Sequence, residues 1–151
     1  MKNKTEGKAE FHTYRGYELL RLEKLQLSPS MEDYLEMIYR TCKEQGYIRI
    51  TNLAQQLNVQ ASAATKTVQK LTEMGLLAYE RYGIIQLTEE GKKIGNFLLQ
   101  RHQIVETFLK NIGVKDNLLR QIEMIEHHLT VDTVRNIEIL NKFFEEYPEI
   151  H

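Results

Sequence analysis

The 151-residue sequence has no Trp, a single Cys and two Pro. One thiol, Cys42, cannot form an intramolecular disulfide, which excludes a disulfide-stabilised secreted fold. No apolar run approaches the roughly 18 residues of a membrane-spanning helix, and the first residues lack the apolar core of a secretory signal. We therefore expect a cytoplasmic chain of about one or two domains, with long segments free of proline and able to form helices.

The chain also lacks an excess of charge of either sign, because 20 Lys and Arg residues are balanced by 21 Asp and Glu residues. This balance excludes a polybasic protein that binds nucleic acid along its whole length. The charges are unevenly distributed, however. Residues 46–95 carry six basic and four acidic side chains, whereas residues 96–151 carry six and nine. We therefore look for polyanionic partners in the middle of the chain and for cations in the acidic segments.

Apolar residues recur at helical spacing through most of the chain, which predicts a mainly α fold. The first helix is predicted to begin near Ser30, which resembles the start of a capping box with Asp33, and to end before Gly46. A short strand is predicted at 47–50. Three long or medium helices follow the middle of the chain, one capped by Thr88 and running to about residue 110, one at about 115–128, and one at 130–146 with Thr130 as its cap.

The middle of the chain has the order helix, turn, helix, two strands, which is typical of a winged helix-turn-helix domain. A helix capped by Thr51 is predicted at 52–57, a second helix at about 60–74, and strands at 76–79 and 84–87. The second helix has a narrow, polar outer face, as insertion into the major groove requires. An amphipathic helical hairpin that only packs on its neighbours is the alternative. The residues predicted to contact DNA are Gln60, Ser62, Ala63, Thr65, Lys66, Lys70 and Arg81.

Carboxylates and histidines stand at helical spacing in three places. These groups are Asp33 with Glu36, His102 with Glu106, and Glu123 with Glu126 and His127. Carboxylate oxygens combined with one or two imidazoles suit Mn²⁺ or Fe²⁺, and no nearby thiol favours a softer metal. Taken singly, the same residues could cap helices or lie on a solvated surface. Spacing alone leaves open whether the three groups converge.

Five segments follow one another in order between residues 28 and 130: SPSMEDYLEMIYR, GYIRITNLAQQLNVQASAATKTVQKLTEMGLLAYERYG, LTEEGKKIG, RHQIVETFL and IEMIEHHLT. Together they resemble the diphtheria toxin repressor family, and within it most the manganese transport regulators, over about residues 28–145. The resemblance implies a homodimeric repressor that a metal activates to bind double-stranded, palindromic operator DNA. It implies an N-terminal extension of unknown role at 1–27, a winged helix-turn-helix domain at 28–96, and a helical metal-sensing and dimerisation domain at 97–151.

The resemblance also implies the metal ligands, two adjacent cations per chain and shared carboxylates between them. The iron-responsive branch of the family has Met where Asp33 stands and Cys where Glu123 stands, so the oxygen ligands here favour Mn²⁺. Fe²⁺, Co²⁺, Cd²⁺ or Zn²⁺ are the substitutes that such ligands could hold. Glu106 matches a second-site ligand of the iron-responsive branch and is a secondary candidate. Matched residue by residue, the ligands are Asp33, Glu36, His102, Glu123, Glu126 and His127.

The sequence therefore predicts a Mn²⁺-activated dimeric repressor of metal-uptake genes, with no catalytic residues. The alternative is a winged-helix regulator that responds to Fe²⁺, Zn²⁺ or a non-metal ligand. A metallohydrolase is disfavoured because no nucleophile or general base is left over. A purely structural dimerisation module would leave the Ala-, Ser- and Lys-rich second helix unexplained. Since few residues follow the last predicted helix, we expect no SH3-like third domain of the kind found in the iron-responsive branch.

Overall fold

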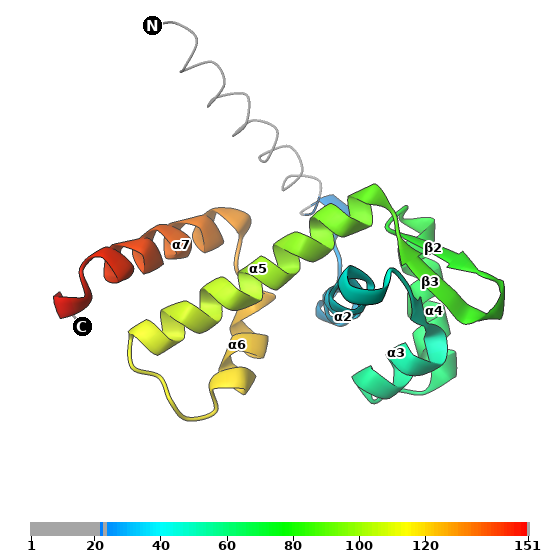
Figure 1. The fold of residues 1–151 in the computed structure, drawn as a ribbon, viewed down its shortest axis with the longest axis horizontal. Helices are drawn as coiled ribbons and strands as arrows, with labels where there is room; N and C mark the ends of the chain where they lie inside the picture. The colour runs from blue at the N-terminus through cyan, green and yellow to red at the C-terminus, as the bar shows by residue number, and fades with distance from the viewer. Residues whose placement is uncertain (1–21, 23, 151) are drawn as a thin grey trace, which may run out of the picture. The chain divides into compact units, whose positions relative to one another are not determined.

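The computed structural model describes residue 22 and residues 24–150, so most of the predicted N-terminal extension lies outside the described residues (Figure 1). The described chain forms two compact units, which adjoin in the sequence between Asn96 and Phe97. Among the described helices, none is long and apolar enough to cross a membrane.

Among its described residues, the first unit combines three complete helices with a small sheet. Its elements are α2 (Pro29–Gln45), β1 (Ile48–Arg49), α3 (Ile50–Leu57), α4 (Ala61–Glu73), β2 (Leu77–Glu80), the 3₁₀ turn η1 (Arg81–Gly83) and β3 (Ile84–Leu87). The strands pair antiparallel in the order β1-β3-β2, with Ile48 opposite Ile85 and Leu77 opposite Leu87. The hairpin of β2 and β3 projects beside α4 (Figure 1). This arrangement confirms the predicted mainly α fold with a winged helix-turn-helix.

Periodic apolar residues hold this unit together. On α4, Ala64, Val68 and Leu71 are fully buried at positions i, i+4 and i+7, which place them on one face of the helix. They share a core with buried residues of the neighbouring elements, since α4 packs on α3, α2 and β2. Because one face of α4 supplies the core, its opposite face is left for solvent or a partner. The other fully buried side chains of this core include Leu35, Ile38, Ile48, Leu53, Leu76 and Ile85.

Two predicted helix starts were wrong. The cap of α2 is Ser28 and not Ser30: the Ser28 hydroxyl accepts a hydrogen bond from the Met31 N–H at 3.2 Å, and Pro29 follows at the first helical position, where its fixed φ fits the helix. Helix α3 begins at Ile50, so Thr51 lies inside its first turn and caps nothing. Strand β1 pairs with β3 and runs directly into α3. This strand pairing fixes where α3 begins and overrides the local capping preference of Thr51.

The end of α4 was predicted correctly. Gly75 follows the helix with a φ of 80°, a left-handed conformation that favours glycine. Its N–H donates to the Thr72 carbonyl at 3.0 Å, and the Leu76 N–H donates to the Leu71 carbonyl at 3.1 Å. This pair of bonds is a Schellman motif, and it turns the chain sharply so that Leu76 and Leu77 enter the core beside α4.

Helix α5 (Glu89–Asn111) begins in the first unit and continues into the second, which adds α6 (Leu118–Glu126), α7 (Val131–Glu146) and η2 (Pro148–Ile150). The predicted caps are confirmed: the Gly91 N–H donates to the Thr88 hydroxyl at 3.0 Å, and the Thr133 N–H donates to the Thr130 hydroxyl at 3.2 Å. Helix α6 is shorter than the predicted 115–128: it begins at Leu118, after a turn at 116–117, and ends at Glu126.

The second unit is stabilised by an apolar cluster and by polar contacts of the buried Asn141. Val105 and Leu109 of α5 are buried against Ile122 of α6. Helix α7 is fixed to α5 by the buried Asn141, whose side-chain N–H donates to the Ile104 carbonyl at 3.0 Å. These contacts orient the inner faces of α5 and α6 toward each other, and that orientation positions the side chains described next.

Candidate metal centre and nucleic-acid interface

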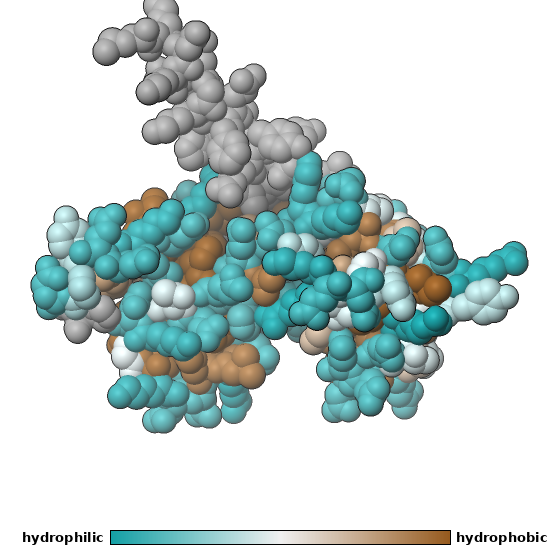
Figure 2. All heavy atoms as spheres, in the orientation of Figure 1, coloured by the Kyte–Doolittle hydropathy of each residue, from teal (hydrophilic) through white to brown (hydrophobic). Residues whose placement is uncertain are grey.

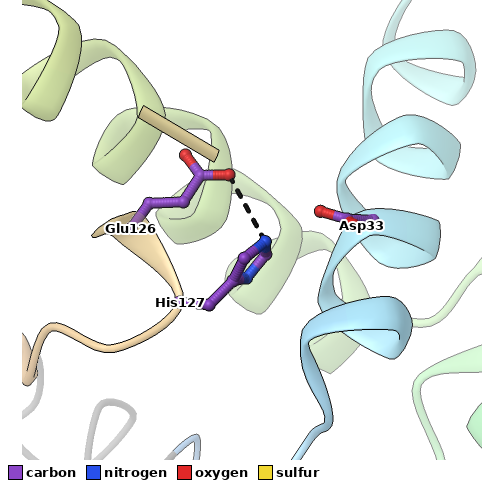
Figure 3. Close-up of side chains that lie close together, drawn as sticks. All are labelled: Asp33, Glu126 and His127. Atoms are coloured by element: carbon purple, nitrogen blue, oxygen red, sulfur yellow. Dashed lines mark ion pairs between the residues drawn. The ribbon is translucent and has the colours of Figure 1, made fainter. Parts of the chain in front are cut away.

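Three of the predicted metal ligands meet within the second unit. His102 projects from α5, Glu126 is the last residue of α6, and His127 is the C-cap residue of that helix. His102 Nδ1 lies 2.9 Å from Glu126 Oε2, and His127 Nε2 lies 3.7 Å from Glu126 Oε1. Figure 3 marks the contact between Glu126 and His127. One carboxylate, only 1% exposed, thus lies between two imidazoles.

The helix periodicity explains why Glu126 is buried. Ile122, one turn earlier on α6, belongs to the apolar core, and position i+4 lies on the same face of a helix. His127 keeps an α-helical backbone, with φ −71° and ψ −17°, so its ring stays beside Glu126. Glu123 lies on α6 as predicted, but it is exposed and joins no cluster of ligand atoms found among the described residues.

A buried arginine, which the sequence reasoning missed, adjoins the same group. Arg101 directly precedes His102 on α5, is 4% exposed, and places Nη2 3.3 Å from His127 Nδ1. A guanidinium can only donate hydrogen bonds, so Arg101 can donate to His127 only if Nδ1 is the acceptor and the ring proton is on Nε2. The sequence did hold a signal: Arg101 takes a core position between the buried Leu98 and Val105 at helical spacing.

The remaining predicted ligands lie on other parts of the chain. Asp33 and Glu36 stand one turn apart on α2, in the first unit, and Figure 3 draws Asp33 on that helix. Asp33 is exposed, whereas Glu36 is buried and accepts a hydrogen bond from Arg40 Nη2 at 2.8 Å. The secondary candidate Glu106 pairs with Lys110 at 2.8 Å, an exposed i, i+4 ion pair of a kind common on helices.

The single cysteine takes no part in this chemistry. Cys42 lies on α2 and its Sγ is 4.0 Å from the carbonyl oxygen of Ile85. Burial raises the pKa of the Cys42 thiol to about 11, although Lys92 opposes the shift. The thiol therefore stays protonated at neutral pH, and it is the thiolate that binds metals. The oxygen and nitrogen donors of the candidate centre remain those of Mn²⁺, Fe²⁺ or Zn²⁺ sites.

The outer face of α4 carries most of the residues predicted to contact DNA. Lys66 and Lys70 are exposed one turn apart, so both ammonium groups can reach phosphates from the same side of the helix. Thr65 is half-buried, and its hydroxyl donates to the Ala61 carbonyl at 2.9 Å, within the helix itself. The other predicted contacts on this helix and its N-cap are exposed: Gln60, Ser62 and Ala63.

The tip of the β2–β3 hairpin adds Arg81, which is exposed, and an aromatic side chain that the sequence reasoning did not assign to DNA. Tyr82 is 90% exposed and has a φ of 69°. A large aromatic ring held in a left-handed turn at the end of a hairpin contributes nothing to the core. Its location in the turn before Gly83, at the tip of the wing, is the signal from which its exposure could have been predicted.

Two family models match the chain. The first, described as the N-terminal DNA-binding domain of the iron-dependent repressors, covers residues 26–85, and the second, described as their metal-binding and dimerisation domain, covers residues 88–151. The chain is 46% identical over 120 residues to the HTH-type transcriptional regulator MntR of Shouchella clausii, covering 79% of this chain and 84% of the relative. It is 45% identical, with the same coverage, to the regulator of that name from Bacillus subtilis.

Solved structures with the same fold include the manganese regulator SloR, with a TM-score of 0.67, 25% identity and 78% of this chain covered. A manganese-dependent transcriptional repressor in complex with manganese gives a TM-score of 0.62 and 28% identity over 74% of this chain. The matches span about half of these two proteins, 55% and 52% of their chains.

The curated relatives are transcriptional regulators and not enzymes, as predicted. With both family models matched, the predicted resemblance is confirmed, and the chain belongs to the family of iron-dependent repressors, metal-dependent transcriptional repressors that bind DNA.

Proposed function

We propose that this chain is a Mn²⁺-activated repressor that binds operator DNA as a homodimer and controls metal-uptake genes. The observation that carries the proposal is the buried Glu126 between His102 and His127, a group with oxygen and nitrogen donors and no sulfur. This donor set fits a hard or borderline divalent cation. The relatives named MntR, and the solved repressor in complex with manganese, support Mn²⁺ as that cation.

The ligand set is proposed to include both units. Asp33 and Glu36 of α2 would add carboxylates to His102, Glu123, Glu126 and His127, which is enough for two cations per chain with shared carboxylates. A bound cation would supply positive charge that attracts the carboxylates of both units. The residues of α2 would then be held to those of α5 and α6, and the winged unit would lose its freedom to reorient.

This restriction explains how metal binding would activate the repressor. In a dimer, fixing each winged unit fixes the separation of the two α4 helices, and a palindromic operator needs them about one helical turn apart (~34 Å). The metal would thus remove a conformational cost that DNA binding would otherwise bear. By linkage, operator DNA would tighten metal binding by the same factor. Since repression acts on chromosomal DNA, we expect the dimer in the cytoplasm.

The dimer contact is proposed to use exposed apolar side chains of the second unit. Leu119 and Met124 of α6 are 60% and 61% exposed, and Ile125 beside them is 37% exposed. Figure 2 shows a hydrophobic patch in the region of α6. Patches of this kind commonly mark protein interfaces, and the second family model includes dimerisation in its description.

A metal titration of DNA binding tests the proposed function. We expect Mn²⁺ to strengthen binding of a labelled operator fragment at least tenfold, measured by fluorescence anisotropy, and Asp33→Ala to remove most of that gain. The wild-type chain treated with a chelator is the reference, and Fe²⁺, Co²⁺, Cd²⁺ and Zn²⁺ are titrated in parallel. DNA affinity that is the same with every metal and with the chelator would contradict the proposal and favour a regulator that responds to a non-metal ligand.

DNA recognition by α4 is tested through its salt dependence. Lys66→Ala and Lys70→Ala are each expected to weaken binding to all DNA sequences alike and to lower the slope of log K against log salt by about one. The reason is that a phosphate contact releases roughly one counterion when it forms. Lys142→Ala on α7 is the matched control, an exposed lysine of the other unit, and its slope should equal that of the wild type. Unchanged slopes in both α4 variants would refute the assignment.

A further inference from the structure

We propose that Arg101 is a built-in competitor of the metal: its contact with His127 and metal ligation by His127 exclude each other. Arg101 would therefore set the metal concentration at which the protein is loaded. The inference rests on the proposed function, because it takes His127 as a ligand. It concerns a residue outside the predicted ligand set, whose side chain is buried at the edge of that set.

The exclusion follows from the two nitrogens of His127. Arg101 Nη2 donates to Nδ1 at 3.3 Å, which leaves the ring proton on Nε2, the nitrogen that faces Glu126. If Nδ1 were the ligand, the cation would take the lone pair that Arg101 now uses. If Nε2 were the ligand, its proton would have to move to Nδ1, and two N–H donors would then face each other. Either way, the contact between Arg101 and His127 must break.

The charge of Arg101 also opposes metal binding. A guanidinium stays protonated in proteins, so Arg101 is a permanent positive charge beside the group that would receive a divalent cation. It is 4% exposed, and the Glu126 carboxylate next to His127 is 1% exposed, so water screens their interactions weakly. This charge lies beside His127, which the proposed function takes as a ligand. Once a cation binds, the same charge repels it.

Variants at position 101 test the proposal, because a competitor and a merely structural residue predict different changes in Mn²⁺ affinity. Removing a competitor should raise that affinity, whereas removing a merely structural residue should not. Arg101→Met removes the charge and the donors while keeping an unbranched side chain, and we expect it to bind Mn²⁺ about tenfold more tightly, equivalent to roughly 1.4 kcal/mol. Arg101→Lys keeps the charge, and its Mn²⁺ affinity should stay closer to that of the wild type. Arg120→Met, an exposed arginine on α6, is the control and should bind as the wild type does. Dissociation constants are measured by competition with a fluorescent chelator.

A second readout is the tautomer of His127, which is measured first in the wild-type protein. ¹⁵N NMR of the metal-free chain should show His127 with its proton on Nε2, and Arg101→Met should shift the ring toward a mixture of the two tautomers. Weaker or equal Mn²⁺ affinity in Arg101→Met, or a wild-type His127 already protonated on Nδ1, would overturn the role of Arg101 alone. Absence of Mn²⁺ binding in the wild type and in every variant would instead overturn the proposed function.

Discussion

Glu126→Gln is expected to weaken Mn²⁺ binding at least about 100-fold, which corresponds to roughly 2.7 kcal/mol, and to abolish the gain in DNA affinity that the metal gives. The substitution keeps the size of the side chain and removes one negative charge. In the second unit, Glu126 is the carboxylate placed between His102 and His127, and it is 1% exposed, so no water can replace its oxygens without repacking. A neutral amide is a much poorer ligand for a hard cation.

The measurement is equilibrium dialysis of Mn²⁺ against the wild type and the variant, with operator binding followed by anisotropy on the same samples. Glu138→Gln on α7 is the matched control, because it removes the same charge from an exposed i, i+4 pair with Lys142 and should leave both affinities unchanged. Circular dichroism confirms that each variant is folded. If Glu126→Gln bound Mn²⁺ as tightly as Glu138→Gln, Glu126 would be excluded as a ligand.

The winged helix-turn-helix could be predicted because local signals and packing agree there. Gly75 ends α4 with a positive φ that favours glycine, and Ala64, Val68 and Leu71 place one face of α4 in the core. The start of α2 was mispredicted because Ser28 and Ser30 are both possible caps, and the start of α3 because its N-cap, Arg49, makes no side-chain cap hydrogen bond. Where each helix begins depends on where the preceding strand or turn ends, and strand pairing is not local.

The metal centre shows the same limit. Spacing on one helix identified Glu126 and His127 as neighbours, and the structure confirms that they are. The spacing could not show that His102, 24 positions before Glu126, contacts it. That contact requires α5 and α6 to pack through Val105, Leu109 and Ile122. Nor did a search for ligand types find Arg101. A charged residue at an apolar position is visible in the periodicity of α5, but only tertiary packing reveals what it contacts.

Gly91→Ala is expected to destabilise the first unit by about 3 kcal/mol or more, the upper end for overpacking a core. Gly91 lies in the first turn of α5, where alanine would by helix propensity alone be the better residue by roughly 1 kcal/mol. A Cβ atom added at this position would lie 1.9 Å from the Leu76 carbonyl oxygen. Because that oxygen belongs to the backbone, it cannot rotate away from the added Cβ. Helix propensity thus predicts that the substitution raises the free energy of unfolding, whereas packing predicts that it lowers it.

The clash would also disturb the junction that attaches α5 to the winged fold. The Leu76 carbonyl accepts a hydrogen bond from the Thr88 N–H at 3.1 Å, and the Thr88 hydroxyl donates to the Gly75 carbonyl at 2.7 Å. Moving Leu76 breaks or lengthens both bonds. Urea unfolding followed by circular dichroism measures the loss, with Lys92→Ala, the exposed neighbour in the same turn, as a control expected within about 0.5 kcal/mol of the wild type. A Gly91→Ala chain as stable as the wild type would show that α5 does not approach Leu76 this closely.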